Sequence, residues 1–149
     1  MNPSPDNAFT RALEEMALDA GMEPLRPDAD GTVALTVDGV PMKLTCREGA
    51  PDDVYCHAQA GSVAGLEYPD RVLEDALVAN FFWRGTDGGT LSVLPGTDTL
   101  MLGDRRDAEY FETADDLREY LAEFARQVRE WHAYLDASRG GSETEGGAR

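Results

Sequence analysis

Lysine occurs once in this chain of 149 residues, at Lys43, and cysteine and histidine occur only twice each. The 13 basic residues are outnumbered by 29 acidic ones, so the formal net charge is −16. A surface of this sign repels phosphate groups, which excludes nucleic acid and anionic membranes as favoured partners. The partners that remain are basic, or neutral and apolar.

Long hydrophobic runs are missing as well. No segment approaches the roughly 18 apolar residues that a membrane-spanning helix needs. Residues 1–6 are too polar for a signal peptide. We therefore expect a cytoplasmic protein in which Cys46 and Cys56 stay reduced, because disulfides are rare in that compartment.

Motifs of catalysis, metal binding and phosphate binding are absent or poorly spaced. Cys56 and His57 are adjacent in a predicted strand, where neighbouring side chains point to opposite faces, so a nucleophile–base pair is disfavoured. The cysteines and histidines lack the CxxC or HxxxH spacing of zinc sites. The segment RGTDGGT at 84–90 follows a helix and has no GK[ST]. We expect no catalytic residue, no metal and no cofactor.

One domain is expected over residues 1–136, followed by a disordered tail of Gly, Ser and Glu over 137–149. The first helix is capped by Asp6 or Asn7 and ends before Gly21. The strands expected next are Thr32–Val37, Val40–Cys46 and Val54–Ala60.

The dipeptide Asp38-Gly39 predicts a two-residue hairpin between the first two strands. In that register every apolar side chain falls on one face. The expected pairs are Val37 with Val40, Leu35 with Met42, and Val33 with Leu44.

The segment from Leu73 to Leu102 is typical of an apolar helix, a glycine-rich turn and a second hairpin. Asp70 is a plausible cap of this helix, which is apolar on two faces, so it is covered either by the core or by another subunit. A turn over Pro95–Asp98 would pair Val93 with Leu100 and Leu91 with Leu102.

A charged loop is expected over 103–112. Thr113 and Asp116 then resemble a capping box, and apolar residues spaced by three or four from Leu117 to Leu135 predict a long amphipathic helix. The order α-β-β-β-α-β-β-α predicts an α+β fold, with a twisted antiparallel sheet flanked by three helices.

The first helix and the first hairpin carry a second set of apolar residues. Each one alone is best explained as core, but a sheet edge beside an amphipathic helix also suits an extended peptide. The residues that could bind such a peptide are Phe9, Leu13, Met16, Val33, Leu35, Met42 and Leu44.

The pattern resembles the type III secretion chaperones of the CesT (Tir chaperone) family over about residues 8–136. The resemblance is most specific in ALVANFFWRGTDGGTLSVLPGTDTLMLGDR, and the final helix TADDLREYLAEFARQVREWHAYL also resembles the family's third helix. It implies a homodimer that holds the N-terminal segment of a secreted effector in an unfolded, secretion-competent form and releases it at the secretion ATPase. The dimer interface it implies is Leu77, Phe81, Phe82, Trp83, Leu91, Val93 and Leu94. It also implies that the peptide-binding residues of the first helix and first hairpin are the effector-binding residues.

Two other interpretations stay open. The same fold could serve a regulatory, immunity-type or other interaction protein outside secretion, since a fold does not fix a function. A small enzyme that uses Cys56 or His57 would need both groups to converge in one pocket, which strand alternation opposes.

Overall fold

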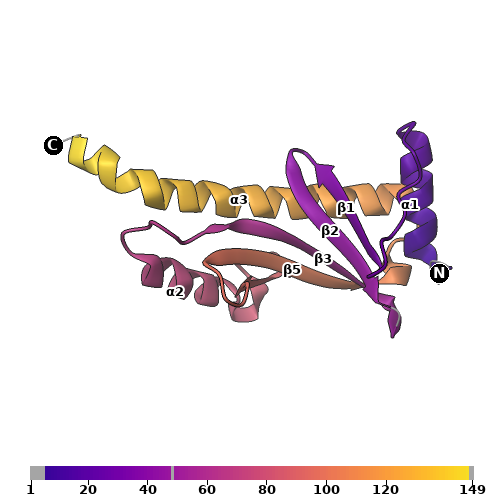
Figure 1. The fold of residues 1–149 in the computed structure, drawn as a ribbon, viewed down its shortest axis with the longest axis horizontal. Coiled ribbons are helices and arrows are strands. Elements are labelled where there is room, and N and C mark those ends of the chain that lie inside the picture. Colours follow the sequence, from indigo (N-terminus) through magenta and orange to yellow (C-terminus); the bar gives the residue numbers. More distant parts are fainter. Residues whose placement is uncertain (1–5, 48, 148–149) are drawn as a thin grey trace. The chain divides into compact units, whose positions relative to one another are not determined.

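The computed structural model describes residues 6–47 and 49–147, with side chains as far as Arg139. Three α-helices and five strands follow the predicted α-β-β-β-α-β-β-α order, with two short 3₁₀ turns added (Figure 1). The sheet has the order β1-β2-β3-β5-β4, so β1 and β4 are its edges. The elements are α1 (Ala8–Asp19), β1 (Thr32–Val37), β2 (Val40–Arg47), β3 (Ala50–Ser62), α2 (Pro69–Ala79), η1 (Phe81–Trp83), β4 (Thr90–Val93), β5 (Thr99–Asp107), η2 (Ala108–Tyr110) and α3 (Ala114–Gly147).

The chain divides into two compact units that share β3, β5 and α3. Unit 1 comprises residues up to 57 together with 104–125, and unit 2 comprises 58–103 together with the chain from 126 onward.

In unit 1, Asn7 begins α1, which confirms one of the two predicted caps. Its Oδ1 accepts a hydrogen bond from the Thr10 backbone N–H at 3.0 Å, and the Thr10 hydroxyl completes a capping box with the Asn7 backbone. Its Nδ2 donates to the Pro51 carbonyl at 2.9 Å. One side chain therefore starts the helix and ties it to β3.

The first hairpin has the predicted register, with Val33 opposite Leu44, Leu35 opposite Met42, and Val37 opposite Val40. The pairing of β2 with β3 runs from Lys43 to Arg47, with a bulge after Cys46. Because Pro41 lies outside that pairing, its missing N–H leaves the β2–β3 ladder intact.

The core of unit 1 is centred on Phe111, which is fully buried between α1 and α3. Its ring lies 5.6 Å from that of Phe9 and 5.2 Å from that of Tyr120. Leu117 and Leu121 of α3 and Leu44 of β2 are buried as well. These residues supply the apolar burial that stabilises the unit.

In unit 2, the second hairpin also has the predicted register, with Leu91 opposite Leu102 and Val93 opposite Leu100. The predicted turn closes through the Leu94 N–H, which donates to the Thr99 carbonyl at 2.9 Å. The β3 backbone comes so close to α3 that a Cβ on Gly61 would lie 2.3 Å from Cδ1 of Leu135. Only glycine allows this approach.

Three predicted details were wrong. Helix α2 begins after Tyr68 with Pro69 in its first turn, and Asp70 is a first-turn residue rather than the cap. Proline suits that position because its fixed φ and missing N–H cost nothing there. The predicted charged loop over 103–112 is instead the end of β5 followed by η2. The third strand is longer than Val54–Ala60 at both ends.

Helix α3 starts with the predicted capping box. The Thr113 hydroxyl accepts from the Asp116 N–H, and the Asp116 carboxylate accepts from the Thr113 N–H, both at 3.1 Å. The backbone of α3 is helical to Gly147, past the boundary at Asp136. The disorder of 137–149 and the single domain over 1–136 stay predictions.

Candidate docking surfaces

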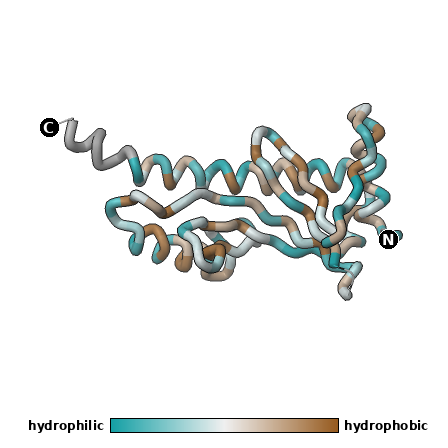
Figure 2. The backbone as a smooth tube through the Cα atoms, viewed as in Figure 1, coloured by the Kyte–Doolittle hydropathy of each residue, from teal (hydrophilic) through white to brown (hydrophobic). Residues whose placement is uncertain are grey.

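The end of α2 and the turn after it expose large apolar side chains to solvent. Leu77 is 71% exposed, Phe81 and Phe82 are each 68% exposed, and Trp83 is 53% exposed. Figure 2 shows hydrophobic colour along this part of the chain. Exposure of this size is unusual, because burying such a side chain is worth about 1.5–3 kcal/mol.

Helix α2 ends at Ala79 because the next residues adopt conformations that a helix cannot hold. Phe82 and Trp83 have φ values of 51° and 54°, in the left-handed region that side chains other than glycine rarely occupy. Each such residue costs about 1–2 kcal/mol. The turn therefore holds two aromatic residues in strained backbone while their side chains lie in water.

Hydrogen bonds around this turn offset the strain. The Gly85 N–H donates to the Ala79 carbonyl at 3.0 Å, and a Cβ on Gly85 would lie 2.7 Å from the Ala79 Cβ. Thr86 is 2% exposed and donates its hydroxyl to the Gly89 carbonyl. The glycine-rich turn predicted after the helix thus allows close backbone packing.

Asn80 joins this turn to the edge strand β4. Its Nδ2 donates to the Leu91 carbonyl at 3.0 Å, and its Oδ1 accepts from the Leu91 N–H at 2.9 Å. The side-chain amide therefore pairs with Leu91 as a neighbouring strand would.

The exposed apolar residues of α2, η1 and β4, together with the residue that follows β4, form what we call the apolar patch. It lies wholly in unit 2, where α2 packs against β4. Its members are Leu77, Val78, Phe81, Phe82, Trp83, Val93 and Leu94.

Six of the seven predicted interface residues belong to this patch. The seventh, Leu91, is 4% exposed and packs inside the chain, although Val93 of the same strand is 42% exposed. Val78 was missed as an interface residue, although its position outside the main helical stripe marked a second apolar face. Whether these residues form an interface stays a prediction.

The predicted effector-binding residues are mostly inside unit 1. Only Met16 and Leu35 are half-buried and accessible. The others are buried, at 4% exposure or less: Phe9, Leu13, Val33, Met42 and Leu44. Their spacing along the sequence was consistent both with a binding surface and with the core, and their burial favours a role in the core. The exposed apolar residues of α1 and the segment after it are Leu18 and Met22, which the helical stripe did not include.

The free edge of β1 is a further exposed feature of unit 1. Thr32 directs its backbone away from β2, because its carbonyl accepts from the Asp28 N–H at 2.9 Å and its N–H donates to Asp28 Oδ1 at 3.0 Å. By the two-residue period of a strand, Ala34 and Thr36 direct their N–H and C=O groups outward too. Both residues are exposed.

Cys56 and His57 do not form a catalytic pair. Cys56 is buried, and desolvation followed by the nearby Asp104 raises the pKa of its thiol, so the thiol is protonated at neutral pH and a poor nucleophile. His57 is half-buried, and burial lowers its pKa, with a smaller contribution from Lys43.

A polar network beside Cys56 has a structural explanation. The Tyr120 hydroxyl donates to Asp104 Oδ2 at 2.8 Å, and Arg106 Nη1 donates to Asp104 Oδ1 at 3.0 Å. The Arg106 guanidinium also lies 5.5 Å from the centre of the Tyr120 ring. Burial raises the pKa of Tyr120, so the phenol remains a donor that ties α3 to β5.

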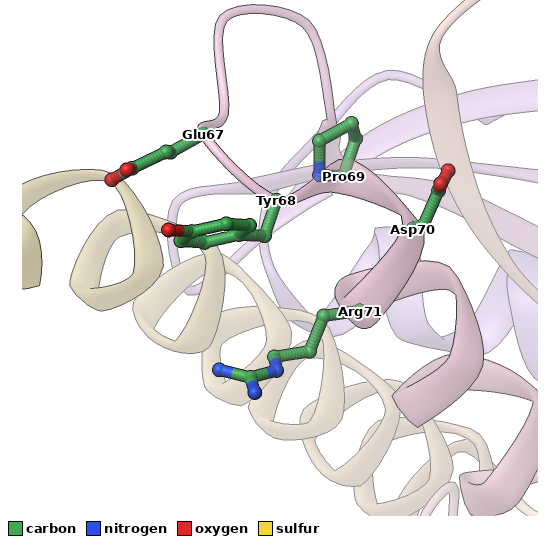
Figure 3. Close-up of a pocket in the computed structure, with 5 residues that line it drawn as sticks. All are labelled: Glu67, Tyr68, Pro69, Asp70 and Arg71. Carbon is green, nitrogen blue, oxygen red and sulfur yellow. The ribbon is translucent and has the colours of Figure 1, made fainter.

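A surface pocket of about 440 Å³ lies at the start of α2 (Figure 3). The Tyr68 ring and the Arg71 guanidinium extend to the same side, 5.9 Å apart, and Asp70 points away from them. The lining comes from five consecutive residues, 67–71, and its charged members face solvent.

Within the described chain, no group of three or more histidine, cysteine or acidic residues is placed to hold a metal ion. In that same part of the chain, no helix has the length and hydrophobicity to cross a membrane. The exposed apolar patch and the free β1 edge are therefore the features that a function must explain.

Comparison with known proteins identifies similar chains. The model of the Tir chaperone protein (CesT) family matches residues 11–132. A search of curated protein sequences found no match.

Solved structures share the fold at low sequence identity. The ExsC–ExsE complex has a chain that is 19% identical with a TM-score of 0.71, covering 85% of this chain and 92% of that one. The HopA1–SchA chaperone–effector complex gives 15% identity and a TM-score of 0.64, with 85% and 94% covered. The Yersinia pestis type III secretion chaperone SycH, in complex with a fragment of YscM2, gives 18% and 0.61, with 83% and 98% covered.

Proposed function

Because the chain belongs to the Tir chaperone protein (CesT) family, we propose that it is a type III secretion chaperone that acts as a homodimer and binds the N-terminal region of an effector. The family consists of binding proteins rather than enzymes, in agreement with the expected lack of catalysis. The observation that best supports the proposed dimer is the apolar patch of unit 2, which is exposed in the single chain.

Charge supports a second copy as the occupant of the patch. A homodimer has a formal charge of −32, twice −16, so two copies approach each other best where acidic residues are absent. Residues 76–86 include no acidic residue and one arginine, and residues 88–97 include no charged residue. The patch thus combines the largest exposed apolar side chains with little negative charge.

The free edge of β1 supports effector binding. An extended segment can pair with the outward N–H and C=O groups of Ala34 and Thr36, which gives affinity without a fixed side-chain sequence. The half-buried Leu35 and Met16 are the accessible members of the predicted effector-binding set. An N-terminal segment held in this way stays unfolded, which is the state that secretion needs.

The dimer is tested by light scattering on the wild type and on Phe82→Asp. We expect about 32 kDa for the wild type, twice 16.2 kDa, and a monomer for the variant, because a carboxylate in an apolar interface is costly. The matched control is Leu18→Asp, an equally exposed apolar residue outside the patch. A folded wild-type monomer would contradict the dimer.

Effector binding is tested with N-terminal segments of secreted proteins encoded beside this one, by co-purification and calorimetry. We expect Thr36→Pro to weaken binding, because proline removes an outward N–H of β1 and leaves the hairpin ladder intact. The control Thr36→Val keeps the N–H and should bind normally. If binding occurs only to non-secreted partners, the regulatory or immunity-type alternative gains support.

A further inference from the structure

The sheet of unit 1 carries the single lysine of the chain on its outer face. Lys43 lies in β2, directly opposite Ala34 of β1 on one side and His57 of β3 on the other. Directly opposite residues of antiparallel strands direct their side chains to the same face. Lys43 is exposed between the buried Met42 and Leu44, so this face is turned away from the core. Ala34, Lys43 and His57 therefore form one row across three strands.

The ammonium group of Lys43 is not neutralised by the protein. Among the residues that the structure describes, no carboxylate lies within ion-pair distance of it. Asp53, near the start of β3, is already paired with Arg105. Burial and, as a smaller contribution, the charge of Lys43 lower the pKa of His57, so this imidazole is neutral at pH 7. Lys43 is thus an uncompensated positive charge on a chain of net charge −16.

The row that contains Lys43 ends at the free edge of β1. The outward backbone groups of Thr32 are bonded to Asp28, so pairing along this edge begins at Ala34. In an added strand of either direction, the residue beside Ala34 directs its side chain to the same outer face. That residue lies two strand spacings, about 10 Å, from β2. Only the methyl group of Ala34 lies between its side chain and the flexible stem of Lys43.

We propose that Lys43 is a specificity-determining residue for effector binding, and that it selects an acidic residue at the position of the bound segment beside Ala34. The inference rests on the proposed binding of an effector segment at the β1 edge and defines the chemistry of one position in that segment. A glutamate or aspartate there can form an ion pair with Lys43 across the small alanine. The next residue on the same face lies beside Thr36, in a row with the uncharged Pro41.

The net charge of the chain limits this preference to a single acidic residue. A segment with many carboxylates is repelled by a chain of net charge −16. A single carboxylate beside Ala34 lies within about one Debye length of Lys43, where attraction is not yet screened. Because an exposed ion pair contributes little free energy, the pair selects among segments, and backbone pairing supplies most of the affinity. The position of Lys43 therefore makes a local exception to the expectation of basic or apolar partners.

The first test scans the charge of bound peptides against the charge of residue 43. The probes are synthetic peptides that tile the N-terminal regions of the secreted proteins encoded beside this one. Each residue of a bound peptide is replaced in turn by Glu, Gln and Lys, and calorimetry gives the affinities for the wild type and for Lys43→Glu. At one position we expect the wild type to bind Glu about 1.5- to 5-fold more tightly than Gln, and Lys43→Glu to prefer Lys instead.

The positions next to the coupled one serve as internal controls, because their side chains point to the other face of the sheet. The matched control variant is Arg71→Glu, which changes the net charge by the same amount at the exposed start of α2 and should keep the preference for Glu. An unchanged preference at every position in Lys43→Glu would contradict selection by Lys43 and leave effector binding intact. Failure of every peptide to bind would contradict effector binding itself, and the inference with it.

The single lysine permits a second test that does not depend on affinity. Reductive methylation with ¹³C-labelled formaldehyde labels the Lys43 amine and keeps its positive charge, and one lysine side-chain signal results. At saturation, the peptide with glutamate at the coupled position should shift this signal more than the matched glutamine peptide does. Equal shifts with the two peptides would show that the carboxylate does not contact Lys43.

Discussion

At the residue scale, the turn at Phe82 and Trp83 has a strained backbone, and this strain brings no burial of the two side chains in the single chain. Phe82 and Trp83 both lie in the left-handed region, and their side chains remain exposed. Strain of this kind persists when surrounding contacts fix the backbone, and it is concentrated at functional sites. Here the fixed turn presents aromatic side chains where the proposed second copy binds.

Comparing Phe82→Gly with Phe82→Ala measures this strain. Both variants lose the ring contact with Phe81, but only glycine relieves the positive φ. We expect the glycine variant to be more stable than the alanine variant by about 1 kcal/mol, in urea unfolding at one protein concentration. A more stable alanine variant would show that the turn relaxes out of the left-handed region.

The thiol of Cys46 makes the stability of the fold depend on alkaline pH. Burial raises its pKa from 9.0 to about 11, so the folded chain retains a proton that the unfolded chain loses. This contribution is complete below pH 9 and is lost as the pH rises toward 11. In urea unfolding at pH 8 and pH 10.5, the wild type should lose more stability than Cys46→Ala. An equal loss in both would contradict the assignment to Cys46.

At the element scale, Asn7 is a cap and a tertiary contact in one side chain. Asn7→Ala loses the bond to Thr10 and the bond to Pro51, and should cost about 1–3 kcal/mol. Asn7→Asp keeps the cap acceptor and loses only the donor to Pro51, so its cost should be smaller. Thermal and urea unfolding of the three proteins give the order, and equal costs would mean that the Pro51 bond contributes little.

The two hairpins show how far element-level prediction reaches. Asp38-Gly39 and Pro95–Asp98 fix both turns, and alternation of apolar residues fixes both registers, which the structure confirms. The turn after α2 was harder to predict, because the Asn80 side chain bonds to the backbone of Leu91, a partner eleven residues away. Asp70 was a reasonable cap by residue type, but the helix starts at Pro69 with Tyr68 as its cap, two residues earlier than a cap at Asp70 implies.

At the scale of the whole molecule, the negative charge of the chain opposes the proposed dimerisation, whereas the apolar interface favours it. Two copies that each carry −16 repel across the solvent, whereas the apolar contact depends little on ionic strength. Added salt should therefore strengthen the homodimer, by about 3- to 10-fold between about 50 and 500 mM NaCl. Sedimentation equilibrium at both concentrations checks this, with sodium chloride as the salt because it is only weakly excluded from protein surfaces. Dissociation at high salt would instead indicate an interface held by ion pairs.

The sequence by itself determined the α+β order, both hairpin registers, the cap at Thr113, and the excess of apolar residues around 77–94, and it limited the first cap to Asp6 or Asn7. Each of these depends on neighbours within a few residues, or on a strict two-residue or 3.6-residue period, and so can be read along the chain. The predicted effector-binding set shows the limit, because Phe9 and Met42 have the same spacing in a core as on a surface.

Only the tertiary structure decided which apolar side chains stay exposed and which backbone groups stay open. Leu91 and Val93 are equivalent by alternation, yet Leu91 is buried and its backbone is bonded to Asn80, whereas Val93 is exposed. That difference arises from contacts between segments separated along the chain, because burial and hydrogen bonding are properties of the packed chain and not of its local pattern.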